Sequence, residues 1–378
     1  MKYDFTSIMD RRGKDALAID GVGSGFAPDA PREGFDVIPM WVADMNFPTV
    51  PTVPAAIIER AAHPAYGYFD PSEAYIGAIL RWQERRHGVT CLTRENLGYE
   101  NGVLGGVVSA LSIFCSRGDN VLLHTPTYVG FTHALRNNGY NMVLSPLVQD
   151  AAGVWRMDFD DMERRIVENR IHAAVFCSPH NPTGRVWERW EVERFTGLCA
   201  KHGVYIISDE IWSDIVRPGV VHTPTRSVSE DAKNRTLALY APSKTFNLAG
   251  LVGSYHIAYD PWILDRMKKA SSLPHYNSMN VLSMHALAAA YSPEGEAWTD
   301  ELCAVIAGNI DYACDFIRER FDGVEVTKPE GTYMLFADCT KWCETHGKTI
   351  DELEKACWDV GVAVQDGRQF HGPCHIRM

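Results

Sequence analysis

The segment Thr236-Leu-Ala-Leu-Tyr-Ala-Pro-Ser-Lys-Thr-Phe246 is an apolar run of strand length that stops before Pro242 and continues into polar residues. Runs of the same kind recur through the middle of the chain, at residues 120–125, 172–177, 204–208 and 254–258. Short apolar runs bounded by turn residues are typical of strands that are buried on both faces. We therefore expect these five segments to form the centre of one sheet.

Segments with a helical period separate several of these expected strands. Residues 160–169 and 188–202 are examples, and in the second the apolar side chains of Val192, Phe195 and Cys199 fall on one face. Strands that alternate with helices predict an α/β fold with a largely parallel sheet. In such sheets the ligand binds beyond the carboxyl ends of the strands, so the polar residues that follow each run are candidates for chemistry.

The pattern changes after residue 278. From there to residue 321 it is helical and nearly continuous, with an expected break at Ser292-Pro-Glu-Gly295, and short segments follow around residues 333–336 and 362–364. We expect a large domain from 46 to 284 and a smaller α+β domain from 285 to 378. Residues 1–45 are rich in Gly, Pro and Asp and are expected to pack against the smaller domain as an arm.

The composition limits the kinds of partner. With 36 Lys and Arg against 48 Asp and Glu, the net charge is -12, so neither nucleic acid nor a membrane is expected as a partner. The start of the chain lacks the basic and apolar segments of an export signal, which favours a cytoplasmic protein. The ten Cys include no C-x-x-C pair, and the group His371, Cys374 and His375 has no second ligand cluster. We expect buried thiols and no metal site.

Two charged side chains follow expected strands. Lys244 lies just past the strand 236–240, where partial desolvation would disfavour its ammonium form and leave a neutral amine able to form a Schiff base. A solvated lysine in a surface loop is the alternative interpretation. Asp209 follows the strand 204–208 and could hold a cation, although an acid at this place also serves as the N-cap of a helix.

Three further segments supply weaker signals. The turn Ser178-Pro-His-Asn-Pro-Thr-Gly184 would present the amide of Asn181, or is a plain loop, and Tyr128 offers an aromatic face after the strand 120–125. The glycine-rich Asn101-Gly-Val-Leu-Gly-Gly106 precedes an expected helix at 107–115, so its backbone N–H groups and the helix dipole could hold a phosphate. The spacing matches neither the dinucleotide fingerprint nor the P-loop, which argues against NAD and ATP.

Taken together, these segments resemble a known family. The chain is similar to the fold-type I pyridoxal-phosphate enzymes, and within them to the cystathionine β-lyase group of the PatB and MalY type. The motifs that carry the resemblance run in the family's order from near the start of the chain to its last residues: Pro39-Met-Trp-Val-Ala-Asp-Met45, His63-Pro-Ala-Tyr-Gly-Tyr68, His180-Asn-Pro-Thr-Gly184, Ser208-Asp-Glu-Ile211, Ala241-Pro-Ser-Lys-Thr-Phe-Asn-Leu-Ala-Gly250, Pro329-Glu-Gly-Thr-Tyr333 and His375-Ile-Arg377.

The resemblance implies a three-layer αβα large domain with a mixed, mostly parallel sheet, a smaller α+β domain, and pyridoxal 5'-phosphate as cofactor. It also implies roles for single residues. Lys244 would bind the cofactor covalently and then remove the substrate α-proton. Asp209 would pair with the pyridine nitrogen and keep it protonated. Asn181 would hydrogen-bond the 3-oxygen of the ring, and Tyr128 would stack on its face.

The phosphate and the subunit structure follow from the same resemblance. Ser243 and the backbone of Gly102, Val103 and Leu104 would hold the phosphate. Tyr68 would reach the phosphate from a second subunit, so a homodimer with shared active sites is expected.

Substrate binding is assigned in the same way. Arg377 would bind the α-carboxylate of an amino-acid substrate through two hydrogen bonds, a role that Lys fills poorly. Without the resemblance, the sequence favours a surface position for Arg377. Ser208 and Trp212 would lie near the cofactor. For Asp44 a stabilising role in the N-terminal arm and a contact with the site are equally compatible with the sequence.

The activity that the resemblance implies is a carbon–sulfur β-lyase. It would convert L-cystathionine, or cysteine and other S-substituted cysteines, into a thiol, pyruvate and ammonia, and L-cystathionine would place the protein in methionine biosynthesis. An aminotransferase uses the same residues and is the first alternative. A MalY-like regulatory protein that retains the cofactor site and binds a transcription activator is the second.

The chain also departs from the family pattern. Asn46 stands where the family commonly has Asp, so a charge near the entrance would be missing, and Trp212 replaces a common His, which could narrow the pocket. Most members carry a strand and a helix after the arginine motif. We therefore expect the smaller domain to be cut short at Met378.

Overall fold

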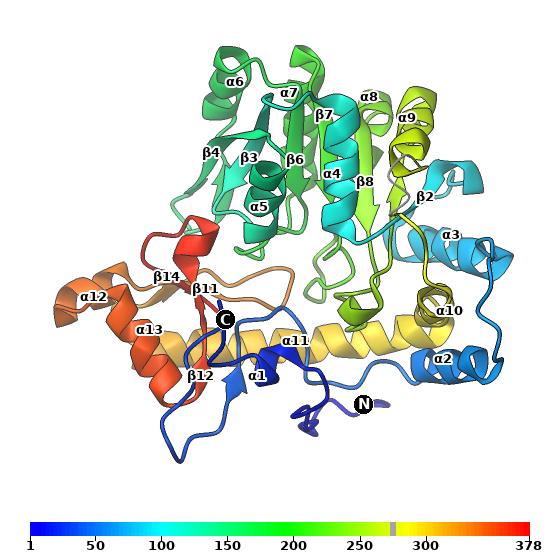
Figure 1. The fold of residues 1–378 in the computed structure, drawn as a ribbon. Coiled ribbons are helices and arrows are strands. Elements are labelled where there is room, and N and C mark those ends of the chain that lie inside the picture. Colours follow the sequence, from blue (N-terminus) through cyan, green and yellow to red (C-terminus); the bar gives the residue numbers. More distant parts are fainter. Residues whose placement is uncertain (273–276) are drawn as a thin grey trace.

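The computed structural model describes residues 1–272 and 277–378, and its largest element is an eight-stranded sheet (Figure 1). Strands β4, β3, β6, β7 and β8 run parallel to one another, and β5, β9 and β2 join the edges in antiparallel pairings. The sheet is therefore mixed and mostly parallel, as expected. In spatial order its strands are β2 (Leu97–Glu100), β9 (Ser254–Ile257), β8 (Thr236–Tyr240), β7 (Tyr205–Asp209), β6 (Ala173–Cys177), β3 (Asn120–Thr125), β4 (Asn141–Gln149) and β5 (Trp155–Met157).

Helices cover both faces of this sheet, because successive residues of its buried strands point to opposite sides. Val121 and Ile207 pack with α4 (Val103–Phe114), α5 (Val129–Asn137) and α9 (Pro261–Ser272) in one apolar cluster. Leu122 and Ile206, each one residue away, pack with α6 (Phe159–Glu168) and α7 (Arg189–His202) in another. The result is the three-layer αβα arrangement expected from the resemblance (Figure 1).

The five expected strands agree with the observed ones to within one residue at each end. The expected break at 292–295 is present but spans only residues 291–292, since α10 (Val281–Ala290) ends before it and α11 (Pro293–Arg320) begins at the proline. Proline suits the first turn of a helix because it has no N–H to leave unpaired there. The side chain of Ser292 caps α11 by accepting a hydrogen bond from the Gly295 N–H at 3.1 Å.

Helix α11 leads from the side of α10 toward a smaller sheet near the C-terminus (Figure 1). That sheet has the order β10 (Glu325–Val326), β11 (Phe336–Asp338), β14 (His375–Arg377) and β13 (Gln365–Asp366), with α12 (Thr340–His346) and α13 (Ile350–Asp359) in the same part of the chain. Strand β1 (Ile38–Pro39) pairs in parallel with β12 (Val362–Ala363). The segment around 333–336 contributes to a strand only from Phe336 onward.

The remaining helices are α1 (Leu17–Asp20), α2 (Thr52–Ala62), α3 (Glu73–His87) and α8 (Glu230–Arg235), with 3₁₀ turns at Arg94–Asn96, Thr225–Ser227, Ala249–Leu251 and Gly367–Phe370. Helices α2, α3, α10 and α11 share one apolar cluster with strands β8 and β9 of the large sheet. The domain boundaries at 45 and 284 stay predictions. Within residues 1–272 and 277–378, no helix has both the length and the apolar character needed to cross a bilayer.

Candidate active site

A cavity of about 430 Å³ opens at the carboxyl ends of β6, β7 and β8, and its size lies in the range of ligand sites, roughly 300–1,000 Å³. Residues from the N-terminal arm, α4, three strand ends and β14 line it together. Of the ten residues that the sequence singles out for the site, nine lie in this wall: Gly102, Val103, Leu104, Tyr128, Asn181, Asp209, Ser243, Lys244 and Arg377.

Lys244 reaches the cavity from the turn that follows β8. The turn is closed by a hydrogen bond from the Phe246 N–H to the carbonyl of Pro242 at 2.9 Å. Thr245, the next residue, is buried, and its hydroxyl donates a hydrogen bond to Asp214 at 3.1 Å, which helps to fix the position of the turn. The Lys244 Nζ donates to the carbonyl of Ala43 at 3.0 Å. Burial lowers the pKa of Lys244 to about 8, and the positive charge of Arg377 acts in the same direction.

Asp209 is the last residue of β7, the strand next to β8, and only 4% of its surface is exposed. Among the residues that the structure describes, its carboxylate accepts one hydrogen bond, from the Ile211 N–H at 3.0 Å. Burial raises the pKa of Asp209 to about 7, against the opposing effects of that hydrogen bond and of Lys244. The carboxylate is therefore a buried acid that a nearby cation would stabilise in its charged form.

Ser208 does not line the cavity, because adjacent residues of a strand point to opposite faces. Its hydroxyl hydrogen-bonds to Glu210 at 3.0 Å and to Thr225 at 2.8 Å. Glu210 also contacts His222 at 2.9 Å, and its pKa is held at about 2 because His222, Arg226 and Tyr240 together outweigh the effect of burial. No feature of the sequence pattern indicates that this second acid has a structural role next to Asp209.

Asn181 is presented by a tight turn after β6, in which the Gly184 N–H donates to the carbonyl of His180 at 2.7 Å. Gly184 has a φ of +67°, and a β-carbon there would lie 2.2 Å from that of Pro329. Only glycine therefore fits this position. The turn brings the Asn181 Oδ1 to 3.5 Å from a nitrogen of Arg377.

Arg377 extends from β14 into the same cavity. Its Nη2 donates to the carbonyl of Trp41 at 2.9 Å, and its guanidinium lies 4.4 Å from the centre of the Phe370 ring. Burial lowers the pKa of Arg377 to about 10. No carboxylate pairs with it among residues 1–272 and 277–378, so this buried cation can bind the carboxylate of a small molecule.

The glycine-rich segment differs from its expected structure. Helix α4 begins at Val103 rather than at residue 107, so Gly105 and Gly106 lie in its first turns. A β-carbon at Gly106 would lie 2.4 Å from the side chain of Leu239, so the glycine permits close packing of α4 on β8. The helix start at Gly102 lies in the cavity wall, where free backbone N–H groups and the helix dipole favour an anion.

The tenth residue, Tyr68, lies in a fully exposed tract at residues 61–71 and is not part of this cavity. Its approach from a second subunit stays a prediction. Trp212 lies in the cavity wall as expected, with its ring centre 5.6 Å from the Lys244 Nζ. Asp44 forms an ion pair with Arg11 at 2.7 Å and does not line this cavity.

Sequence reasoning missed the backbone groups that hold the two cations. The carbonyls of Ala43 and Trp41 bind Lys244 and Arg377, and both belong to the motif Pro39-Met-Trp-Val-Ala-Asp-Met45. That motif belongs to those that carry the resemblance, but a contact made by a backbone carbonyl cannot be predicted from the pattern of side chains.

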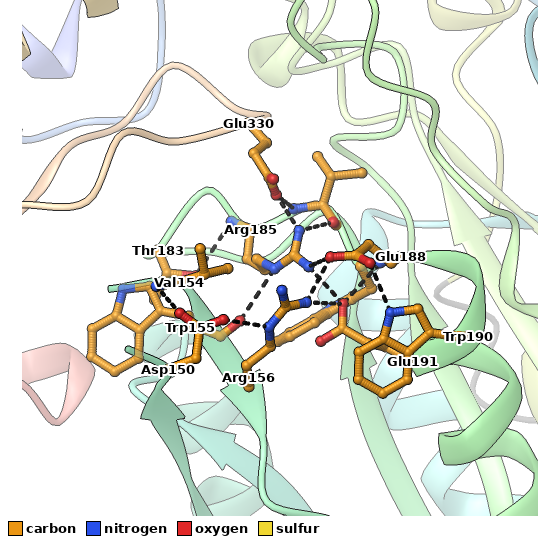
Figure 2. A network of polar contacts seen from close by, with 12 residues as sticks. Asp150, Val154, Trp155, Arg156, Thr183, Arg185, Glu188, Trp190, Glu191 and Glu330 are labelled. Atoms are coloured by element: carbon orange, nitrogen blue, oxygen red, sulfur yellow. Dashed lines mark hydrogen bonds and ion pairs between the residues drawn. The ribbon is translucent and has the colours of Figure 1, made fainter. Parts of the chain in front are cut away.

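A network of ion pairs surrounds the buried Arg185, which follows the turn that carries Asn181; Figure 2 shows the network. Arg185 pairs with Glu191 at 2.6 Å and Glu188 at 2.9 Å, and it also contacts Glu330. Glu330 belongs to the segment that leads into β11, and its N–H donates to the carbonyl of Gly184 at 2.9 Å. The network thereby ties the Asn181 turn to the part of the chain that carries Arg377.

We expect Arg185→Met to destabilise the protein by about 3 kcal/mol, because it leaves Glu191 buried with one fewer cationic partner. The measurement is the midpoint of urea unfolding, followed by tryptophan fluorescence. Arg189→Met is the matched control, since Arg189 forms an exposed pair with Glu193 and should change stability by less than about 1 kcal/mol. Equal midpoints for the two variants would contradict the role of the network.

Comparison with known proteins agrees with this geometry. The family model described as aminotransferase class I and II matches residues 36–378. This chain belongs to that family. Within it, the cystathionine β-lyase PatB of Bacillus subtilis (strain 168) is 32% identical over 372 residues, which cover 98% of this chain and 92% of the relative.

Two solved structures of PLP-containing relatives have the same fold. The PLP-bound C–S lyase from Staphylococcus hominis is 30% identical, with a TM-score of 0.89 over 99% of this chain and 93% of that one. Cystalysin from Treponema denticola, which contains a pyridoxal 5'-phosphate cofactor, is 28% identical, with a TM-score of 0.91 over 100% of this chain and 94% of that one. Both thus support the aminotransferase-family assignment over nearly the whole chain.

Proposed function

We propose that this protein is a pyridoxal 5'-phosphate-dependent carbon–sulfur β-lyase. It would release a thiol, pyruvate and ammonia from L-cystathionine or related S-substituted cysteines. The observation that carries the proposal is that Lys244 and Asp209 line the same cavity. Asp209 ends β7, Lys244 follows the adjacent strand β8, and Arg377 lies in the wall of the same cavity. The names of the similar proteins, cystathionine β-lyase and C–S lyase, support the same activity.

The residues of the cavity fit the cofactor. Lys244 is desolvated, so its amine is available for covalent attachment. Asp209 is a buried acid suited to a protonated ring nitrogen, and Asn181 supplies an amide for the ring oxygen. The start of α4 and the hydroxyl of Ser243 suit a phosphate, and the ring of Tyr128 offers an aromatic face.

When bound, the cofactor withdraws electron density from the substrate α-carbon and so makes its proton acidic. The protein supplies the remaining groups. Asp209 would hold a proton on the ring nitrogen, Arg377 would bind the α-carboxylate, and the Nζ of Lys244 would accept the α-proton. Trp41 and Ala43 position the two cations through their carbonyls.

A turnover assay tests the activity. The protein is mixed with L-cystathionine and no keto acid, and pyruvate is followed with lactate dehydrogenase. We expect steady pyruvate release over many turnovers. A single turnover that leaves pyridoxamine 5'-phosphate would overturn the lyase and favour an aminotransferase, the alternative that the family's description keeps open.

The lowered pKa of Lys244 predicts the pH dependence of cofactor attachment. An amine with a pKa of about 8 instead of 10.5 is mostly neutral above pH 8. The rate at which the apoprotein captures pyridoxal 5'-phosphate, measured by absorbance, should therefore rise about 10-fold per pH unit below 8 and level off above it. Nα-acetyl-lysine, whose amine keeps the ordinary pKa, is measured in parallel, and its rate should keep rising to about pH 10. A protein rate that also keeps rising to about pH 10 would contradict the desolvation of Lys244.

The proposed active unit is a homodimer in which Tyr68 reaches the phosphate of the partner's cofactor. The exposed tract at residues 61–71 supports it, because Tyr66, Tyr68 and Phe69 all expose large aromatic surface there. Light scattering should give twice the chain mass of 42.3 kDa. Tyr68→Phe should raise the dissociation constant of the cofactor and leave the dimer intact; a monomer, or unchanged cofactor affinity in this variant, would refute the shared site.

We also propose the cytoplasm as the location and methionine biosynthesis as the pathway. All ten cysteines are free, as in most proteins of reducing compartments. The name of the PatB relative supports the pathway. The regulatory alternative stays a prediction.

A further inference from the structure

The wall of the Lys244 cavity carries few charges. Among the lining residues in the described parts of the chain, three are charged: Asp209, Lys244 and Arg377. The proposed lyase uses all three, for the ring nitrogen, the α-carbon and the α-carboxylate. None of them is left to neutralise a second charge farther along the substrate side chain.

The wall that the N-terminal arm contributes is apolar. Leu17 and Phe26 line the cavity with 51% and 81% of their surfaces exposed, and Val252 faces it from the loop after Lys244 with 45% exposed. The Phe26 ring packs edge-on against Trp41, with 5.7 Å between the ring centres. Trp41 also binds Arg377 through its carbonyl, so the apolar wall adjoins the group that would hold the substrate carboxylate.

The proposed second subunit adds no permanent cation to this wall. The exposed tract at 61–71, which we propose lies near the partner's cavity, contains no Lys or Arg, and its ionisable side chains besides tyrosine are His63 and Asp70. It therefore supplies no Lys or Arg partner for a distal carboxylate at the mouth of that cavity.

We propose that the substrate carries an uncharged sulfur substituent, so that S-alkyl-L-cysteines react better than L-cystathionine. The inference rests on the proposed lyase activity and specifies its substrate class. The distal end of L-cystathionine carries both an ammonium and a carboxylate group, and an apolar wall would remove water from them without supplying partners. An alkyl group gains from the same burial.

The reaction keeps its ordinary balance with such a substrate. The carbon–sulfur bond breaks, the sulfur leaves as a thiol, and the α-proton passes to Lys244. One water is consumed as the remaining three-carbon fragment hydrolyses, so each S-alkyl-L-cysteine and water give one thiol, one pyruvate and one ammonium ion.

A matched set of substrates tests the inference on the holoenzyme. S-propyl-L-cysteine is neutral at its distal end, S-(2-carboxyethyl)-L-cysteine is anionic, S-(2-aminoethyl)-L-cysteine is cationic, and L-cystathionine carries both charges. All four release alkyl thiols. We expect kcat/KM for the propyl compound to exceed each of the others by about 10-fold or more. Equal or faster reaction of L-cystathionine would overturn the inference, whereas absence of pyruvate with all four would instead refute the lyase.

A binding measurement gives a readout that needs no elimination. L-Norleucine, L-lysine and L-2-aminoadipate have no leaving group on the β-carbon, and their dissociation constants can be obtained by titrating the absorption of the bound cofactor. L-Norleucine should bind about 10-fold more tightly than the two charged amino acids. Equal affinities would contradict the apolar wall even if the lyase assay failed.

A pair of substitutions tests whether the apolar wall at Phe26 contacts the sulfur substituent of the substrate. Phe26→Lys places a cation at the mouth and should improve kcat/KM for the carboxyethyl compound relative to the propyl compound by about 5-fold. Phe35→Lys is the control, because Phe35 is also exposed in the arm but does not line the cavity, and its ratio should stay at the wild-type value. An unchanged ratio in Phe26→Lys would overturn the assignment of this wall to the substrate.

Discussion

Lys244→Ala should lower lyase activity by about 10⁴-fold, because it removes both the covalent attachment of the cofactor and the base that takes the α-proton. The desolvated amine in the cavity, with its pKa lowered to about 8, is the basis for this expectation. The measurement is pyruvate release from S-propyl-L-cysteine at saturating cofactor. Borohydride reduction should fix the cofactor to the wild-type chain and not to the variant.

Lys341→Ala is the control for this experiment, since Lys341 is an exposed lysine on α12 and lies outside the cavity. It should retain full activity and the borohydride product. Full lyase activity in Lys244→Ala would remove Lys244 from the mechanism, whatever the state of the cofactor.

Asp209→Asn should lower kcat by about 10²- to 10³-fold with little loss of protein stability. The amide has the size of the carboxylate but no charge, so it cannot hold a proton on the ring nitrogen. Stability should change little because the native carboxylate is buried with one hydrogen bond, from Ile211, and its raised pKa shows that its charge is not well compensated. The absorption spectrum of the bound cofactor should shift as its ring nitrogen loses the proton.

Asp160→Asn provides the matched control for Asp209→Asn. The side chain of Asp160 is fully exposed on α6, so its change should affect neither kcat nor the spectrum. If Asp209→Asn kept both the wild-type kcat and the wild-type spectrum, the carboxylate would not act on the ring nitrogen.

The local pattern was sufficient to predict the buried strands and the polar residues at their ends. Apolar runs such as 236–240 favour strands that are buried on both faces, and the polar residues after parallel strands lie at one edge of the sheet. Asp209 and Lys244 line one cavity at that edge, and their chemical roles stay predictions. Helix α4 starts four residues before its predicted start, because glycine is more typical of loops, whereas Gly106 serves close packing against Leu239.

The αβα layering, the family and the polar residues beyond the strand ends could be predicted from the order of the residues, since these depend on periodicity and on residue types in short motifs. The surroundings of those polar residues emerge only in the folded chain. The carbonyls of Trp41 and Ala43 lie more than 200 residues from their partners, and the apolar wall of Leu17, Phe26 and Val252 is assembled from separate segments of the chain. Every residue has a backbone carbonyl, so the order of residues does not reveal which carbonyls bind a cation. Only the folded chain shows which of them contact Lys244 and Arg377, and which side chains line the rest of the cavity.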